Sequence, residues 1–214
     1  MKKKNCRNFY ASAVMLAAFG LWTAAVLFVD VKAIGPYESA VGFATVNAFV
    51  HRLTGVNMSL YHITDWLGLV PIFVAVGFAV LGLIQWIKRR RLSKVDYSIL
   101  VLGGFYITVM AVYMLFETVT VNYRPVLIDG ISEKSYPSST TLLVMCIMPT
   151  AIMQLRSRIK DASLRNWVSL FISAFIIFMV IGRLVSGVHW FSDIVGGILL
   201  SAGLVMMYRY FVKE

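Results

Sequence analysis

Two polar segments interrupt an otherwise apolar chain of 214 residues and carry the side chains that could do chemistry. One runs from Arg124 to the hydroxyl-rich stretch 136–141, and the other contains Arg183, His189 and Asp193. On a helix, residues four apart share one face, so the histidine and the aspartate are expected to meet. A carboxylate can hold one imidazole N–H and leave the other nitrogen free as a nucleophile or base. An interfacial salt bridge is the alternative interpretation of this pair.

The two arginines suit an anion. The guanidinium groups of Arg124 and Arg183 are forked donors that match the geometry of phosphate oxygens. Each arginine taken singly fits equally well with a side chain that snorkels to the membrane surface. Together with the His–Asp pair, they indicate a phosphate site.

Hydroxyl groups are expected at the start of a helix near these arginines. Pro137 suits a first helical turn, so Ser138, Ser139 and Thr140 would surround the free N–H groups there. The N-terminal dipole and the open donors both favour phosphate. A plain helix cap is the structural alternative.

Composition decides what kind of elements position these residues. The chain is 59% hydrophobic and 14% charged, and its mean hydropathy is +0.79. Soluble domains carry roughly 45–50% apolar and about 25% charged residues, so this composition excludes a soluble domain and a disordered chain. It also excludes a nucleic-acid-binding protein, although the net charge is +10. Cys6 and Cys146 lie in a basic tail and an apolar run, so we expect two free thiols.

The apolar runs predict an all-α protein, a bundle of six membrane-spanning helices that forms one domain over residues 1–214. The expected spans cover about 10–34, 65–87, 97–116, 137–155, 164–182 and 189–210. The first run follows a basic tail, as in a signal peptide, but the residues after it make a poor cleavage site. The weakly amphipathic stretch 39–53 is expected to lie along the membrane interface.

Basic residues predict the orientation. Fifteen of the twenty fall in alternate loops on one side of the six-span arrangement. They are Lys2, Lys3, Lys4, Arg7, Lys88, Arg89, Arg90, Arg91, Lys94, Arg156, Arg158, Lys160, Arg165, Arg209 and Lys213. By the positive-inside rule this side and both termini are cytoplasmic, so the polar segments face the extracytoplasmic side of a cell membrane.

Taken together, the polar segments resemble the motifs of the membrane-bound type 2 phosphatidic-acid phosphatase superfamily. That family has Lys-x6-Arg-Pro, Pro-Ser-Gly-His and Ser-Arg-x5-His-x3-Asp at one face of a six-span core. The matching residues here are Arg124 and Pro125, Pro137 and Ser138, and Arg183, His189 and Asp193. The resemblance implies that His189 is the nucleophile and forms a phosphohistidine, and that Asp193 orients it. It also implies that the two arginines and Ser138 hold phosphate oxygens, without a metal or a cofactor.

Four positions depart from the family pattern. Glu117 stands where the first motif has lysine, and Gly182 replaces the serine before the second arginine. Ser139 and Thr140 occupy the glycine and histidine positions of the second motif, where the family's histidine is the general acid. Lys134 is a possible substitute for the lost cation.

The absence of the family's general acid at Thr140 affects which substrate is expected. General acid catalysis contributes typically 10²–10⁴-fold, mostly for poor leaving groups. A phosphate-type leaving group, with a second pKa of about 6, needs the proton less than an alkoxide does. The sequence therefore predicts a lipid phosphatase that acts on a lipid diphosphate, such as undecaprenyl pyrophosphate or another polyprenyl pyrophosphate, in preference to phosphatidate. A non-catalytic protein that binds or transports lipid phosphates, and a small unrelated transporter, are the alternatives. The sequence leaves the oligomeric state open.

Overall fold

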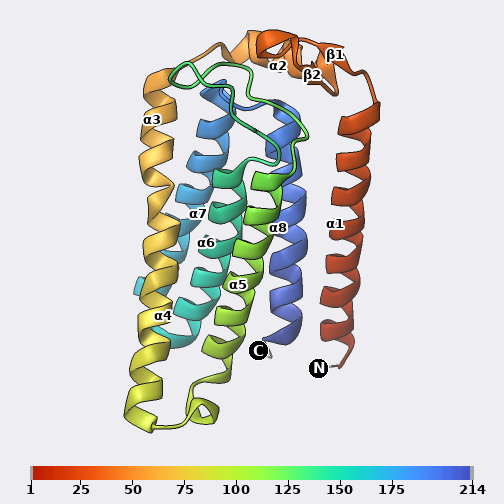
Figure 1. Cartoon of the computed structure of the whole chain (residues 1–214). Helices are drawn as coiled ribbons and strands as arrows, with labels where there is room; N and C mark the ends of the chain where they lie inside the picture. Colours follow the sequence, from red (N-terminus) through yellow and green to blue (C-terminus); the bar gives the residue numbers. More distant parts are fainter. Residues whose placement is uncertain (1, 213–214) are drawn as a thin grey trace.

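The computed structural model describes residues 2–212 and is almost entirely helical (Figure 1). Its elements are α1 (Lys2–Phe28), β1 (Lys32–Ala33), η1 (Pro36–Glu38), β2 (Ala40–Val41), α2 (Ala44–Thr54), α3 (Met58–Leu67), α4 (Leu69–Arg89), η2 (Leu92–Lys94), α5 (Tyr97–Thr118), α6 (Ser139–Arg158), α7 (Ala162–Val185) and α8 (Phe191–Phe211). The two strands form a small antiparallel hairpin in which Lys32 faces Val41 and Ala33 faces Ala40.

The six predicted spans are confirmed. Six helices are long and apolar enough to cross a membrane, and α3 and α4 together make one of them, Met58–Arg89. This second span begins before the predicted residue 65, because helix α3 already starts at Met58, where the side chain of Asn57 accepts a hydrogen bond from the Leu60 backbone N–H. Asp65 therefore lies inside a helix.

The first span is shorter than predicted, because α1 ends at Phe28 and the chain does not continue as a helix to residue 34. Asp30 has a left-handed backbone with φ 48°, and its carboxylate accepts a hydrogen bond from the Thr45 N–H at 2.6 Å. The same carboxylate forms an ion pair with Lys32 at 2.9 Å. The Thr45 bond first, and then Lys32, lower the pKa of Asp30 to about 2. A charged carboxylate thus turns the chain from α1 into the hairpin and the start of α2.

Helices α6 and α8 form the centre of the bundle. Half of the apolar window of α6 and 61% of that of α8 are buried, against 6% of the α3–α4 span. Glycines allow the close approach, because a Cβ at Gly196 would meet the ring of Tyr136 at 2.7 Å and one at Gly197 would meet Thr141 at 3.1 Å. Helices α6 and α8, which follow the two polar segments, are therefore the most deeply buried of the membrane-spanning helices.

The amphipathic stretch 39–53 forms β2 and α2, which lie with β1 across one end of the bundle (Figure 1). Asn47, on its inner face, is buried and donates from Nδ2 to the Ser192 hydroxyl at 2.9 Å. Val46, Phe49 and Leu53 are exposed on the helix. Helix α1 begins and helix α8 ends at the opposite end of the bundle, where the α4–α5 loop also lies (Figure 1). Lys213, counted in the predicted charge asymmetry, lies outside the described residues.

Candidate active site

The predicted site residues meet around the ring of His189, in the loop between α7 and α8. The Nη1 of Arg124 lies 3.3 Å from Nε2 of His189, and the Nη2 of Arg183 lies 3.1 Å from the same atom. A guanidinium group can only donate, so Nε2 accepts and the ring proton is assigned to Nδ1. An unprotonated nitrogen therefore faces the point where two cationic donors converge.

His189 is held in its neutral form. Burial, and then the charges of Arg124 and Arg183, lower its pKa well below the ordinary histidine value. Its exposed fraction is 3%. A neutral imidazole with a free Nε2 is the form that can attack an electrophile.

Asp193 lies beside the imidazole ring of His189, but the two residues do not lie on one face of the same helix. The predicted arrangement on one helix is wrong, because α8 starts at Phe191 and His189 precedes it. Asp193 is the third residue of α8, and its Oδ2 accepts from the Trp190 N–H at 2.9 Å, as in a capping box. The same Oδ2 lies 3.8 Å from Nδ1 of His189, too long for a hydrogen bond but within range of a charge interaction.

The carboxylate of Asp193 is fully buried and bound on both oxygens. Its Oδ1 accepts from Nδ2 of Asn122 at 3.2 Å. Nδ1 of His189, in contrast, has no hydrogen-bond partner in the part of the chain that the structure describes. The interaction that Asp193 offers His189 is therefore electrostatic.

The loop between α5 and α6 brings Arg124 to the ring. A β-bridge pairs Tyr123 with Lys134, and the backbone N–H of Arg124 donates to the Glu133 carbonyl at 2.9 Å. The Nε of Arg124 also forms an ion pair with Oε2 of Glu133 at 2.9 Å. This leaves the outer nitrogen of the guanidinium group directed at His189.

Arg183, in the last turn of α7, reaches the site from the opposite side, and two residues of α3 hold it. It is 1% exposed, and its Nη1 lies 3.5 Å from Oδ1 of Asp65. The ring of Tyr61 lies beneath both guanidinium groups, 5.0 Å from Cζ of Arg183 and 5.8 Å from Cζ of Arg124. These distances fall in the range of a cation–π interaction.

Sequence reasoning missed the role of α3. The only local signal was the spacing of Tyr61 and Asp65, four residues apart and thus on one face of a helix. No motif links them to Arg183, which is more than a hundred residues away. Their contribution depends on α3 packing against α7.

The loop that carries His189 is fixed by a backbone contact with the α2–α3 junction. The Asn57 N–H donates to the Ser186 carbonyl at 3.0 Å. Gly187 has φ 69°, and a Cβ there would lie 1.8 Å from the carbonyl oxygen of Gly55. Only glycine fits this turn, because any side chain would strike the opposing backbone.

The three hydroxyls predicted at the start of α6 have different surroundings. Ser138 is the N-cap, and its hydroxyl accepts from the Thr141 N–H at 3.4 Å and from the Thr141 hydroxyl at 3.0 Å. Ser139 lines a small pocket beside His189. Thr140 points its methyl group toward Gly68, where an added Cβ would lie 3.4 Å away. Of the three, Ser139 lies beside the imidazole in this pocket.

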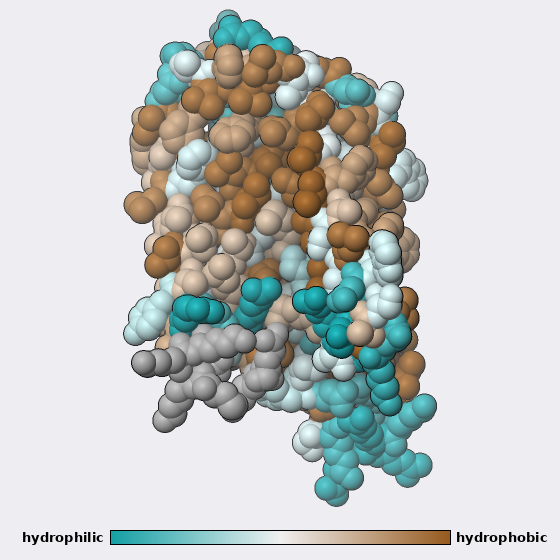
Figure 2. Space-filling model, turned by 180° about the vertical axis from the view of Figure 1, so that it is seen from behind, coloured by the Kyte–Doolittle hydropathy of each residue, from teal (hydrophilic) through white to brown (hydrophobic). Residues whose placement is uncertain are grey.

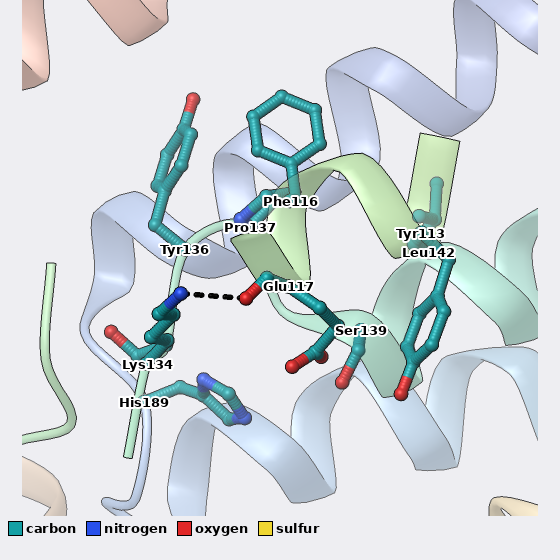
Figure 3. A pocket seen from close by; sticks show the side chains of 10 residues that line it. Tyr113, Phe116, Glu117, Lys134, Tyr136, Pro137, Ser139, Leu142 and His189 are labelled. Atoms are coloured by element: carbon teal, nitrogen blue, oxygen red, sulfur yellow. Dashed lines mark hydrogen bonds between the residues drawn. The ribbon is translucent and has the colours of Figure 1, made fainter. Parts of the chain in front are cut away.

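The pocket beside His189 also contains Lys134 and Glu117 (Figure 3). The ammonium group of Lys134 donates to the Glu117 carbonyl at 2.6 Å and to the Thr118 carbonyl at 2.9 Å. These carbonyls end α5 and have no partner within the helix, so a cation there also suits the helix dipole. Lys134 therefore lies directly against the residue that stands in the lysine position of the first motif. Among the described residues, no three His, Cys, Asp or Glu side chains gather as they would around a metal ion.

The geometry defines a helical membrane protein with a buried cluster of arginines around a neutral histidine. Residues 120–214, which include both arginines, Lys134, the α6 hydroxyls and the His–Asp pair, match the family model of the PAP2 superfamily. The structure is similar to the crystal structure of a transmembrane PAP2 type phosphatidylglycerolphosphate phosphatase from Bacillus subtilis, with 16% sequence identity, a TM-score of 0.61 and 94% of each chain covered. A search of curated proteins finds no match. The chain is thus similar to the membrane PAP2 superfamily in sequence over residues 120–214 and in fold over nearly its whole length.

Proposed function

We propose that this protein is a lipid phosphatase in which His189 attacks phosphorus. The observation that carries the proposal is the convergence of two guanidinium groups on the unprotonated Nε2 of a buried neutral imidazole. A phosphate bound there would take over the donors of Arg124 and Arg183, which brings phosphorus next to the nucleophile.

The reaction would proceed in two steps. Nε2 of His189 forms a bond to the terminal phosphorus as the bond from that phosphorus to the bridging oxygen breaks, which leaves a phosphohistidine and releases a lipid monophosphate anion that carries the bonding electron pair. Asp193, near Nδ1, would stabilise the positive charge that develops on the ring. Water then attacks phosphorus, releases inorganic phosphate and restores the neutral imidazole.

The surroundings of the leaving group favour a lipid diphosphate. Thr140 takes the place of the family's acid, and its methyl group faces Gly68. A lipid monophosphate leaving group needs less protonation than an alkoxide, so a polyprenyl diphosphate would react more readily than phosphatidate. The similar Bacillus subtilis protein is named a phosphatidylglycerolphosphate phosphatase, which makes phosphatidylglycerolphosphate the natural comparison substrate.

The placement of the basic residues supports a site at the extracytoplasmic face of the cell membrane. The start of α1, the α4–α5 loop, the α6–α7 connection with the residues that flank it, and the end of α8 carry most of them and lie at the end of the bundle opposite α2 (Figure 1). The positive-inside rule then assigns that end to the cytoplasm.

The test is phosphate release by the purified full chain from polyprenyl diphosphate, phosphatidylglycerolphosphate and phosphatidate in mixed micelles. His189→Ala is expected to lower turnover by about 10³-fold or more, because it removes the nucleophile. The control is His62→Ala, which removes an exposed imidazole from α3. Full activity of His189→Ala would refute the mechanism, and faster turnover of phosphatidate than of the diphosphate would refute the substrate preference.

Non-catalytic binding of lipid phosphates is the second candidate. It is favoured by Thr140, which replaces the family's general acid and points its methyl group toward Gly68. The same experiment separates the two, since a binding protein would retain vanadate but release no phosphate from any of the three lipids.

A further inference from the structure

A long apolar groove runs between α4 and α5, outside the site. Its volume is about 890 Å³, and its lining is almost wholly apolar. Gly103 and Gly104 line it, and a Cβ added at either would meet no atom within 4 Å. The volume is that of a ligand pocket, and the missing side chains keep it open.

One end of the groove reaches the end of the bundle that lies opposite the site. Trp86, at the end of α4, lines the groove there with Leu92 and Val95 of the following loop. A tryptophan is typical of the level where hydrocarbon meets headgroups. The groove therefore opens at a membrane surface and not only toward the lipid tails.

Five basic residues lie next to Trp86, Leu92 and Val95 in the sequence, at this end of the groove. They are Lys88, Arg89, Arg90, Arg91 and Lys94, and all five are exposed. Among the described residues, only Arg89 of these five forms an ion pair, with Asp96 at 2.9 Å. Figure 2 shows hydrophilic residues gathered at this end of the molecule, below a hydrophobic belt.

Neither feature alone would specify a ligand. An apolar groove in a membrane protein would accept any lipid tail, and a basic loop alone would only set orientation. A basic cluster at the mouth of an apolar groove matches a molecule with an anionic head and a hydrocarbon tail. Basic pockets between membrane helices bind such headgroups, and each Lys or Arg adds to the attraction.

We propose that the α4–α5 groove binds an anionic phospholipid from the leaflet opposite the active site. Its acyl chain would lie along the groove past Gly103, and its phosphate would meet Arg90 and Arg91, which can bind phosphate oxygens in a bidentate manner. This site is separate from the one that contains His189, and it does not depend on catalysis.

The first experiment uses the wild-type full chain. Native mass spectrometry counts the lipids retained after incubation with equal amounts of dioleoyl phosphatidylglycerol and dioleoyl phosphatidylcholine. These lipids share their acyl chains and differ in headgroup charge. Retention of the anionic lipid at least about fivefold above the zwitterionic one is expected. Equal retention overturns the proposal.

Variants then locate the bound lipid. Gly103→Phe fills the groove, and the double change Arg90→Glu with Arg91→Glu reverses the charge at its mouth. Both are expected to lose the preference for phosphatidylglycerol. The matched controls keep it: Gly77→Phe adds a ring on α4 where an added Cβ meets no atom within 4 Å, and Lys160→Glu with Arg165→Glu reverses two charges beyond the end of α6.

Other outcomes would contradict the proposal. If the Lys160 and Arg165 changes abolish the preference equally, the attraction belongs to the whole basic face. If Gly103→Phe alters the mass of the particle in light scattering, the groove is a contact between two copies. If it raises KM for a long-chain lipid phosphate while phosphatidylglycerol retention is unchanged, the groove holds the substrate tail. Thermal unfolding checks each variant, with Gly103→Leu as the milder replacement.

Discussion

The two ends of the bundle both bury polar side chains, but they use their hydrogen-bonding groups in opposite ways. At the end away from the site, Nε2 of Gln154 donates to the Tyr208 hydroxyl at 2.5 Å and to the Ser98 carbonyl at 3.1 Å. Asp96 there accepts from Gln85 at 2.8 Å and from Arg89 at 2.9 Å. These bonds join α4, α5, α6 and α8, so this polar network holds helices together.

At the site end, the hydrogen-bonding groups are only partly matched. Two guanidinium groups share one neutral ring nitrogen, and Nδ1 of His189 lacks a hydrogen-bond partner among the described residues. Buried polar groups are usually paired, and an unpaired one in a native protein needs an explanation. The contrast supports the proposal above, in which one network stabilises the fold and the other binds a phosphate.

Of the variants that test this contrast, removal of an arginine at the site is expected to change vanadate affinity the most. Arg124→Ala or Arg183→Ala deletes a charge-assisted contact of about 1.5–3 kcal/mol, so vanadate affinity should fall roughly tenfold to a hundredfold. Arg52→Ala, which removes an exposed arginine of α2 at the same end, is the control. Calorimetric titration measures the affinities. Unchanged vanadate binding in both site variants would contradict the proposed anion site.

A smaller effect is expected from the ring beneath the arginines. Tyr61→Leu removes a cation–π interaction of about 0.5–2 kcal/mol, which should weaken vanadate binding by about twofold to thirtyfold. Tyr61→Phe keeps the ring and should bind as the wild type does. Equal losses in the two variants would assign the effect to the hydroxyl group instead. Tyr37→Leu, at an exposed position, is the control.

The pH dependence tests the neutral state of His189. Its pKa is lowered by burial and by the two arginines, so the imidazole of the free protein stays unprotonated below the ordinary value of about 6.5. The acidic limb of kcat/KM, which reports the free enzyme, is therefore expected below pH 6.5. Folding disfavours the proton, so stability too should fall as the pH drops below about 6.5. An acidic limb above pH 7 would contradict this assignment.

A change in the polar network at the end of the bundle away from the site should alter the stability of the fold and leave anion binding unchanged. Gln154→Leu removes the bonds to Tyr208 and Ser98, and is expected to lower the free energy of unfolding by about 1 kcal/mol. Vanadate affinity should stay within about twofold of the wild type. Denaturation in micelles and titration with vanadate measure the two quantities. A loss of affinity as large as that of Arg183→Ala would show that the two ends are coupled.

The sequence predicted the spans well, because hydropathy is a local property of each apolar run. The spacing of Arg183 and His189 also brought them together correctly, because a short loop cannot separate them far. What the sequence could not supply were partners distant in the chain, such as Tyr61 and Asp65 on α3. It also placed His189 on a helix, since a four-residue spacing does not reveal that the helix begins two residues later.

The contact between Gly55 and Gly187 gives the molecule a mechanical property. Backbone meets backbone there, with no side chain that could rotate to absorb a displacement. Helix α2 ends one residue before this contact, and His189 follows it by two residues. The position of the α2–α3 junction therefore limits where the loop that carries the imidazole can lie.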